Sequence, residues 1–419
     1  MFAVVDKWFF AKGSPVTLGV FRVVICSIAF INLAMIAIDF NDWFGENGYV
    51  PVEVGLRYSG DKLYAIGNAK EGLPILDLAQ PLPRINLLSN VASTEWTAVF
   101  YVLTMAAALF AAVGLWTRIM TIALAIGMVT LHHRNLLILH GGDTALRQFL
   151  IIIAIAPSGA AVSLDRFIAV WKGKAPAIPE AITMWGQRLV QYQLALLYFT
   201  AVWYKWQGSH WRDGTATFYI SQLREFNRFW VPEFMERQPV LSITTYGTLF
   251  TELALATLVF YKPFRKWVLL AGLAMHGYIE YRFNIPMFAF VVTSGYLCFY
   301  DGEETVAWAK RVGQRFKRAH LRILLPAGLR LAKDKGDAIK NMDPLNMVDY
   351  QQGDTSEWQA AAASGKKRDP FLASWQRSIG AWPLALIWRK LLIKAAEPIP
   401  SEPAQTKDKR QATAAKGGV

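Results

Sequence analysis

The chain has 419 residues, of which 54% are hydrophobic and only 18% are charged. Several stretches run for about 18 residues or more with almost no charge, the length that crosses a hydrocarbon core of about 30 Å. This pattern excludes an ordinary soluble enzyme, and the two cysteines, Cys26 and Cys298, exclude a disulfide framework or a multi-cysteine metal site. The composition predicts an all-α, polytopic bundle of transmembrane helices.

Eight stretches are predicted as membrane spans, at about residues 16–38, 96–115, 118–135, 146–162, 186–206, 240–261, 266–282 and 284–300. The first is too long for the apolar part of a cleavable signal peptide and contains Arg22, so we expect it to be retained. Trp and Tyr crowd the ends of these stretches, as they do at membrane–water interfaces. We expect one transmembrane domain over residues 1–301.

Lysine and arginine residues beside the predicted spans indicate the orientation of the chain. With eight spans, the five basic clusters near span ends all fall on one side of the membrane. Because positive charge is retained on the cytoplasmic side, both termini are predicted to be cytoplasmic. The ionisable residues that could support chemistry then gather near the outer ends of the helices.

The part of the chain from Gly302 onward is basic, with 21 of the 44 Lys and Arg residues but only 12 of the 31 Asp and Glu residues. Residues 302–396 are predicted to form a cytoplasmic tail. Within it, residues 305–332 and 371–396 mix basic and apolar side chains, as amphipathic helices on a membrane surface do. We expect contact with the lipid bilayer and its anionic lipids, no nucleic-acid partner, and disorder over residues 397–419.

One charge interrupts the aromatic stretch YQLALLYFTAVWYKWQGSHWRDG at residues 192–214. Lys205 directly follows Trp203 and Tyr204, and Trp211 comes shortly after it. Partial burial among aromatic residues disfavours an ammonium group, so that Lys205 could act as a general base. The lysine could equally extend its amine to the headgroups while its stem lines the span. The residues alone leave both interpretations open.

Other predicted spans also carry ionisable residues. His276, in AMHGYIEYRFNIPMF, is expected to face the bundle interior, where it could orient a substrate, relay a proton or pack. Glu280 lies one helical turn later on the same face, so the two could handle protons or form a structural hydrogen bond. Arg22 and Glu252 would offset each other's burial if they met, and the sequence leaves this open.

The stretch between the third and fourth spans reads HHRNLLILHGGDTALRQF. Gly141 and Gly142 permit a tight turn there, and Asp143 can cap the helix that follows. We interpret this pattern as architectural. The spacing of the three histidines matches no zinc pattern, so no metal is predicted.

These stretches resemble the membrane core of the vitamin K-dependent γ-carboxylases and the horizontally transferred transmembrane (HTTM) family of bacterial membrane proteins. The most specific similarities are LLYFTAVWYK followed by WRDG, and HGYIEYRFNIPMF at residues 276–288. Shorter ones are VFR at 20–22, LWTRI at 115–119, RN followed by HGGD at 134–143, and SLDR at 163–166. The resemblance implies a bacterial inner-membrane protein.

In the carboxylases, a lysine after the matching motif is taken as the base that deprotonates vitamin K hydroquinone. The anion reacts with O2, and the strong base that results removes a γ-proton from a glutamate, which then captures CO2. The resemblance implies that Lys205 is this base, that reduced vitamin K or another membrane hydroquinone is the cofactor, and that a secreted peptide is modified. Leu136 departs from the carboxylases, which have a histidine there, so quinol chemistry is expected ahead of glutamate carboxylation.

From these patterns and the resemblance we expect catalytic, substrate-binding and structural residues. The catalytic residues are Lys205 and His276; the substrate-binding residues are Trp203, Tyr204, Trp211, Glu280, Arg282 and Phe283; the structural residues are Arg22, Asn135, Gly141, Gly142, Asp143 and Glu252. A non-catalytic membrane component for maturation, export or immunity of a secreted peptide is the alternative function. A transporter is a third, although the paired Gly/Pro-broken spans of transporters are not seen.

Overall fold

A computed structural model describes residues 2–52, 54, 86–88 and 91–315, together with 321–325, 329–341, 348–352, 372–375, 391 and 394–398. The chain forms two compact units. The first comprises residues 1–169 and 178–307, and the second comprises 170–177 and 308–419. The first unit contains every predicted site residue.

Eight helical elements of the first unit lie where the sequence predicted apolar spans. They are α2 (Val16–Ile36), α5 (Thr94–Val113), α6 (Thr117–Arg134), α7 (Gly141–Ile155), α9 (Trp185–Gln207), α12 (Gln238–Ala256), α13 (Lys262–Arg282), and α14 (Phe288–Ser294) continued by the 3₁₀ turn η5 (Gly295–Phe299). The described part of the chain is therefore mainly helical, as predicted. Within it, two helices, Val16–Phe44 and Thr94–Val113, are long and apolar enough to cross a membrane by length and composition, and Phe288–Phe299 is a shorter apolar helix.

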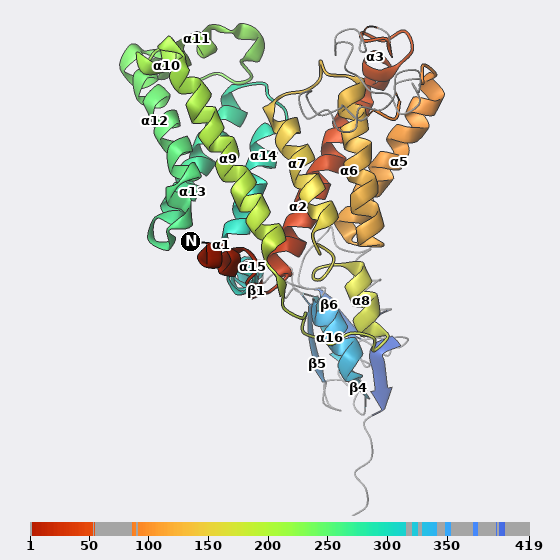
Figure 1. Ribbon diagram of the computed structural model, residues 1–419. Helices are drawn as coiled ribbons and strands as arrows, with labels where there is room; N and C mark the ends of the chain where they lie inside the picture. Colours follow the sequence, from red (N-terminus) through yellow and green to blue (C-terminus); the bar gives the residue numbers. More distant parts are fainter. Residues whose placement is uncertain are drawn as a thin grey trace, which may run out of the picture. The chain divides into compact units, whose positions relative to one another are not determined.

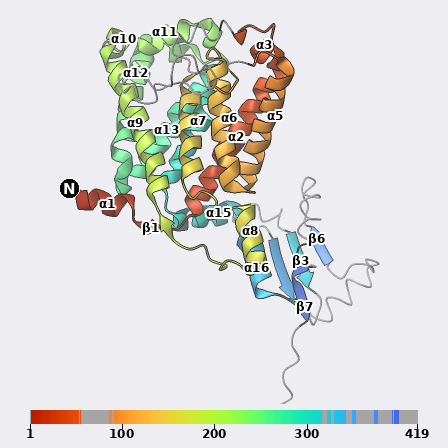
Figure 2. The same cartoon turned by 45° about the vertical axis from the view of Figure 1, so that its right-hand side comes forward.

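The long helices of the first unit run side by side (Figures 1 and 2). In one group α5 packs against α2 and α6, and α6 packs against α7; in the other α12 packs against α9 and α13. α7 and α14 contact each other, and α7 contacts α9, so that the two groups share one core. Phe21 and Phe149 meet edge to face inside it, with ring centroids 5.4 Å apart.

Short elements precede, connect or follow the long helices. They are α1 (Phe2–Phe9), η1 (Ala37–Asp39), α3 (Phe40–Phe44), α8 (Leu164–Trp171), α10 (Ser209–Arg212), α11 (Ala216–Gln222), η2 (Arg224–Phe226), η3 (Glu233–Glu236), η4 (Leu258–Phe260) and α15 (Gly302–Arg315). Strand β1 (Lys12–Gly13) pairs antiparallel with β2 (Ile182–Thr183), with Lys12 opposite Thr183. This pairing joins the chain before α2 to the chain before α9.

The second unit contains strands that the sequence analysis did not predict. In one sheet β3 (Leu321–Leu325) pairs parallel with β5 (Val348–Gln352) and antiparallel with β6 (Leu372–Trp375); in the other, β4 (Leu329–Leu331) pairs with β7 (Ala396–Pro398). Helix α16 (Lys333–Asn341) lies between β4 and β5 in the chain.

The predicted surface helix over residues 305–332 agrees with α15 as far as Arg315 and is wrong at residues 321–325 and 329–331, which form strands. The mixture of basic and apolar residues suggested one amphipathic helix, but LRILL at 321–325 forms a strand because strands distant in sequence supply its hydrogen-bond partners. In the predicted helix over 371–396, residues 372–375 are also a strand. Most of that segment, and of the tail predicted to be disordered, lies outside the described residues.

Candidate functional site

Lys205 lies in the last turn of α9 and forms an ion pair with Glu252 of α12, donating a hydrogen bond from Nζ to Oε1. The Lys205 side chain is 25% exposed and the Glu252 side chain only 8%. The amine also lies 5.2 Å from the centroid of the Trp211 ring, within range of a cation–π interaction. The amine thus faces a buried carboxylate of the protein instead of extending freely to solvent.

The second carboxylate oxygen of Glu252 has no hydrogen-bond partner among the described residues, although it is buried. A carboxylate normally accepts several hydrogen bonds when it is buried. In the ion-paired form, Nζ of Lys205 already carries its proton, so the unused acceptor of the pair is Oε2 of Glu252. A further proton would therefore be accepted on Oε2 of Glu252, which would become a neutral carboxylic acid while Lys205 stays cationic.

Three more polar side chains, those of Tyr198, His276 and Tyr296, form a second buried group. Tyr198 of α9 lies with its hydroxyl 2.8 Å from Nε2 of His276 on α13 and 2.7 Å from the hydroxyl of Tyr296 in η5. Gly272 makes room for this arrangement, because a Cβ atom at this position would come within 2.4 Å of the Tyr296 hydroxyl. The His276 ring also packs against Phe288, with centroids 5.4 Å apart.

The two groups belong to one polar cluster, which we define as Lys205, Glu252, Tyr198, His276 and Tyr296. Glu252 lies within electrostatic reach of both tyrosines, and Lys205 lies within electrostatic reach of His276. Nδ1 of His276 is buried and, in the described part of the chain, unpaired. The cluster thus joins four helical elements through side chains that can accept and donate protons.

His276 and Glu280 do not form the pair that their spacing allowed. Glu280 binds Arg228 instead, with 2.9 Å between Oε1 and Nη1, and its backbone carbonyl accepts from the same guanidinium at 3.1 Å. His276 has Tyr198 as its partner. His276 and Glu280 therefore have separate partners: His276 belongs to the buried group around Tyr198, and Glu280 binds the loop residue Arg228.

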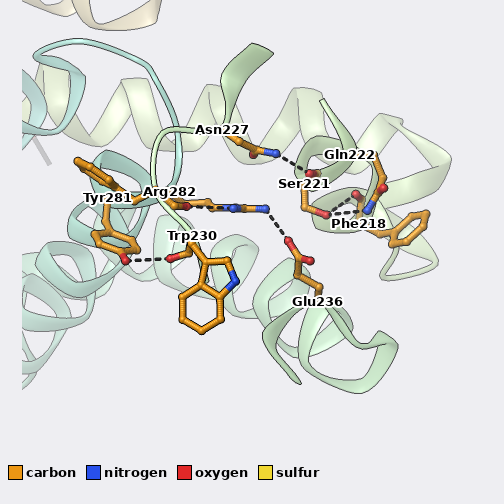
Figure 3. Close-up of polar contacts among 9 residues, drawn as sticks. Phe218, Ser221, Gln222, Asn227, Trp230, Glu236, Tyr281 and Arg282 are labelled. Carbon is orange, nitrogen blue, oxygen red and sulfur yellow. Dashed lines mark hydrogen bonds and ion pairs between the residues drawn. The ribbon is translucent and has the colours of Figure 1, made fainter. Parts of the chain in front are cut away.

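Arg282 and Phe283 both bind the loop between α11 and α12, and Figure 3 shows Arg282 with its partner Glu236. The buried Arg282 donates from Nη1 to the carbonyl of Phe229 at 3.0 Å and from Nη2 to Glu236 at 2.5 Å. Phe283 forms an antiparallel β-bridge with Asn227. Both residues, predicted as substrate contacts, thus bind other parts of the chain.

Trp203 and Tyr204, also predicted to contact substrate, are 61% and 73% exposed. They occupy other faces of α9 than Lys205, because successive residues on a helix are rotated by about 100°. Trp211 is the predicted aromatic residue that the structure brings to the amine.

Arg22 and Glu252 do not meet. The fully buried Arg22 guanidinium donates instead to the backbone carbonyls of Ser158, at 3.2 Å, and of Val162. It thereby ties α2 to the turn after α7. The predicted partner, Glu252, is taken by Lys205.

The predicted structural residues before α7 form a cap. His140, not Asp143, is the N-cap residue: its Nδ1 accepts from the Gly142 N–H at 3.0 Å, and Asp143 Oδ2 accepts from the His140 N–H at 2.8 Å. Gly141 is the first residue of the helix. Asn135 donates to the carbonyl of Trp43 at 2.9 Å.

Among the described residues no three His, Cys, Asp or Glu side chains gather as a metal site would require.

Sequence reasoning missed Tyr198 and Tyr296. Tyr198 lies seven residues, or two helical turns, before Lys205, so the shared helix face was a signal that could have found it. Tyr296 carried no such signal, because its contact with Tyr198 spans 98 residues of sequence.

Comparison with known proteins identifies the family but no individual relative. The HTTM domain matches residues 83–303, which is more than half of the chain and includes the whole polar cluster. No curated protein and no solved structure matches the chain. The chain is therefore a membrane protein that belongs to the HTTM domain family.

Proposed function

We propose that the protein is a multi-pass enzyme of the bacterial inner membrane in which Lys205 and Glu252 together act as the base toward a membrane hydroquinone. Modification of a secreted peptide at the outer face would be coupled to this step. The observation that carries the proposal is the half-buried amine of Lys205 held against a buried carboxylate that has an unused oxygen.

The membrane arrangement is part of the proposal. The helices α2, α5, α6, α7, α9, α12 and α13, and α14 with η5, would each cross the bilayer, with both termini in the cytoplasm. Exposed apolar side chains on α9, α12 and α13 support this arrangement, because they would face lipid. They include Leu196, Phe199, Ile243, Phe250, Leu270 and Leu273. A charged pair enclosed by such helices is typical of functional sites in membranes.

The residues present fit a hydroquinone. When bound, such a group would supply an acidic hydroxyl and reducing equivalents. The Trp211 ring offers an aromatic surface beside the amine, and Glu252 Oε2 can take up a hydroxyl proton while Lys205 stays cationic. The Lys205 ammonium would then stabilise the negative charge left on the hydroxyl oxygen. The three remaining residues of the polar cluster could pass that proton on.

The test measures the oxygen-dependent oxidation of reduced vitamin K in membranes that contain the protein. The rate is read from the absorbance of the quinone that forms. Lys205→Met should lower the rate by about 10²–10⁴-fold, the usual contribution of a positioned base. Lys266→Met is the matched control, because Lys266 is an exposed lysine of α13. Equal oxidation by the Lys205 variant and the parent would overturn the proposal. A parent protein with no oxidation above empty membranes would favour the non-catalytic alternative.

A further inference from the structure

Helix α11 and the loop between α11 and α12 present aromatic side chains outward. The exposed apolar residues of this stretch include Tyr219, Leu223, Phe226, Phe229, Trp230 and Phe234. Trp230 is 76% exposed. Single exposed apolar residues are common on protein surfaces, but so many within a short segment mark an interaction surface. We define residues 218–234 as the aromatic segment.

This exposure is imposed by the structure around the segment. The end of α13 binds the backbone that carries the aromatic rings: Arg282 donates to the Phe229 carbonyl at 3.0 Å and Tyr281 donates to the Trp230 carbonyl at 2.8 Å (Figure 3). The ion pair Arg228–Glu280 holds the middle of this stretch, and Arg282–Glu236 holds the residues just after it. The backbone that carries these rings is therefore held by hydrogen bonds, while the Phe229 and Trp230 side chains stay largely exposed.

The non-helical backbone of the segment finds its hydrogen bonds within the protein. Asn227 donates from Nδ2 to the Ser221 carbonyl at 3.0 Å, the Arg228 N–H binds the Arg282 carbonyl at 2.8 Å, and the Asn284 N–H binds the Phe226 carbonyl at 2.6 Å. Irregular backbone is tolerated close to hydrocarbon only where such groups are satisfied by protein. A loop surrounded by water would not need these bonds.

The segment also lies at the level where α9 ends and α12 begins. Thr217 of α11 donates to the carbonyl of Leu241 in the first turn of α12 at 2.6 Å, and Tyr246 donates to the carbonyl of Arg212 at 2.9 Å. Figure 1 shows α10 and α11 at this end of the helices. The exposed Trp203 and Tyr204 also lie near the end of α9.

We infer that the aromatic segment lies in the headgroup layer of the bilayer, with its rings inserted among the lipids. Trp, Tyr and Phe beside arginines are the residues that favour this layer, because it receives both an apolar ring and a polar group. The inference rests on the membrane arrangement proposed above and does not depend on the chemistry of Lys205. A lipophilic substrate that diffuses in the bilayer would meet this surface.

The test uses single nitroxide labels on introduced cysteines, in the full chain reconstituted into vesicles of phosphatidylethanolamine and phosphatidylglycerol. The native Cys26 and Cys298 are buried, so labelling is selective. For each nitroxide label, the frequency of collisions with O2, which concentrates in lipid, is compared with the frequency of collisions with a water-soluble nickel complex. Phe229→Cys and Trp230→Cys should give a higher ratio of O2 to nickel collisions than Glu233→Cys, whose native side chain is 87% exposed in the same loop.

Phe250→Cys, on the exposed face of α12, is the control for the membrane arrangement. If Phe250 reports lipid while Phe229 and Trp230 collide with nickel as often as Glu233, the inference about the segment alone is wrong. If the labels at Phe229 and Trp230 are shielded from both reagents, protein covers them and the inference is likewise overturned. Nickel access at Phe250 would contradict the membrane arrangement and, with it, this inference.

Discussion

The Tyr198 hydroxyl lies 2.8 Å from His276 Nε2 and 2.7 Å from the Tyr296 hydroxyl, so one oxygen joins α9 to both α13 and η5. All three side chains are buried. Because water does not replace a lost partner at such a site, each hydrogen bond fixes how two helices pack. The cluster is thus a structural joint as well as a candidate proton path.

Tyr198→Phe should destabilise the protein more than Tyr296→Phe. The first change leaves both His276 and Tyr296 without their partner, and each unpaired buried group costs about 1–3 kcal/mol. The second change removes one hydrogen bond only. Thermal unfolding in detergent, measured for both variants, checks the order. Equal melting temperatures for the two variants would show that the hydrogen bond between Tyr198 and His276 does not stabilise the fold.

Gly114→Ala should destabilise the first unit. Gly114 ends α5 with a φ of 78°, where an L-residue costs about 1–2 kcal/mol, and the new Cβ would lie 2.7 Å from Arg22 Nη1. Gly247→Ala is the matched control, because a Cβ in this α12 position meets no atom within 4 Å. The control should be neutral or stabilising by up to about 1 kcal/mol. Denaturation that ranks the two variants in the opposite order would contradict this.

Removing the Glu236 charge should loosen the loop that carries the aromatic segment. Glu236→Gln weakens the contact with the buried Arg282, and a loss of about 1–2 kcal/mol would raise the open population roughly 5–30-fold. Trypsin should then cut faster at Arg224 or Arg228. Glu233→Gln provides the comparison, since its partner Arg237 and Glu233 itself are largely exposed and such pairs contribute little. Equal cleavage rates in the two variants would argue that the Arg282–Glu236 contact does not hold the loop closed.

Native protein should not react with maleimide at Cys26 or Cys298, because both thiols are buried in the helix core. Alkylation counted by mass spectrometry should rise to two groups per chain after unfolding. Labelling of folded protein at either position would mean that the core opens, and would also remove the basis for selective labelling of introduced cysteines.

The sequence predicted where the long helices lie but not which charged residues meet. Apolar runs fix helix positions locally, so α2, α6 and α9 begin and end within a few residues of the predicted spans. The Lys205–Glu252 contact joins residues 47 apart, whereas the sequence had suggested only Arg22 as a partner for Glu252. Helix packing decides between such partners. The strands at 321–325 and 329–331 were missed for the same reason, because their partners lie far along the chain.

The proposed base requires that Lys205 and Glu252 act as one unit, and a double-mutant cycle on hydroquinone oxidation tests this most directly. Rates are measured for Lys205→Met, Glu252→Gln and the double variant, with reduced vitamin K and O2 in membranes of equal protein content. If the pair is the base, each single variant loses about as much activity as the double variant, since residues that act together are not additive. The double variant also avoids an unpaired buried carboxylate, which can cost about 3–5 kcal/mol when fully buried. Parent-like oxidation by Glu252→Gln, or losses that simply add, would contradict the account.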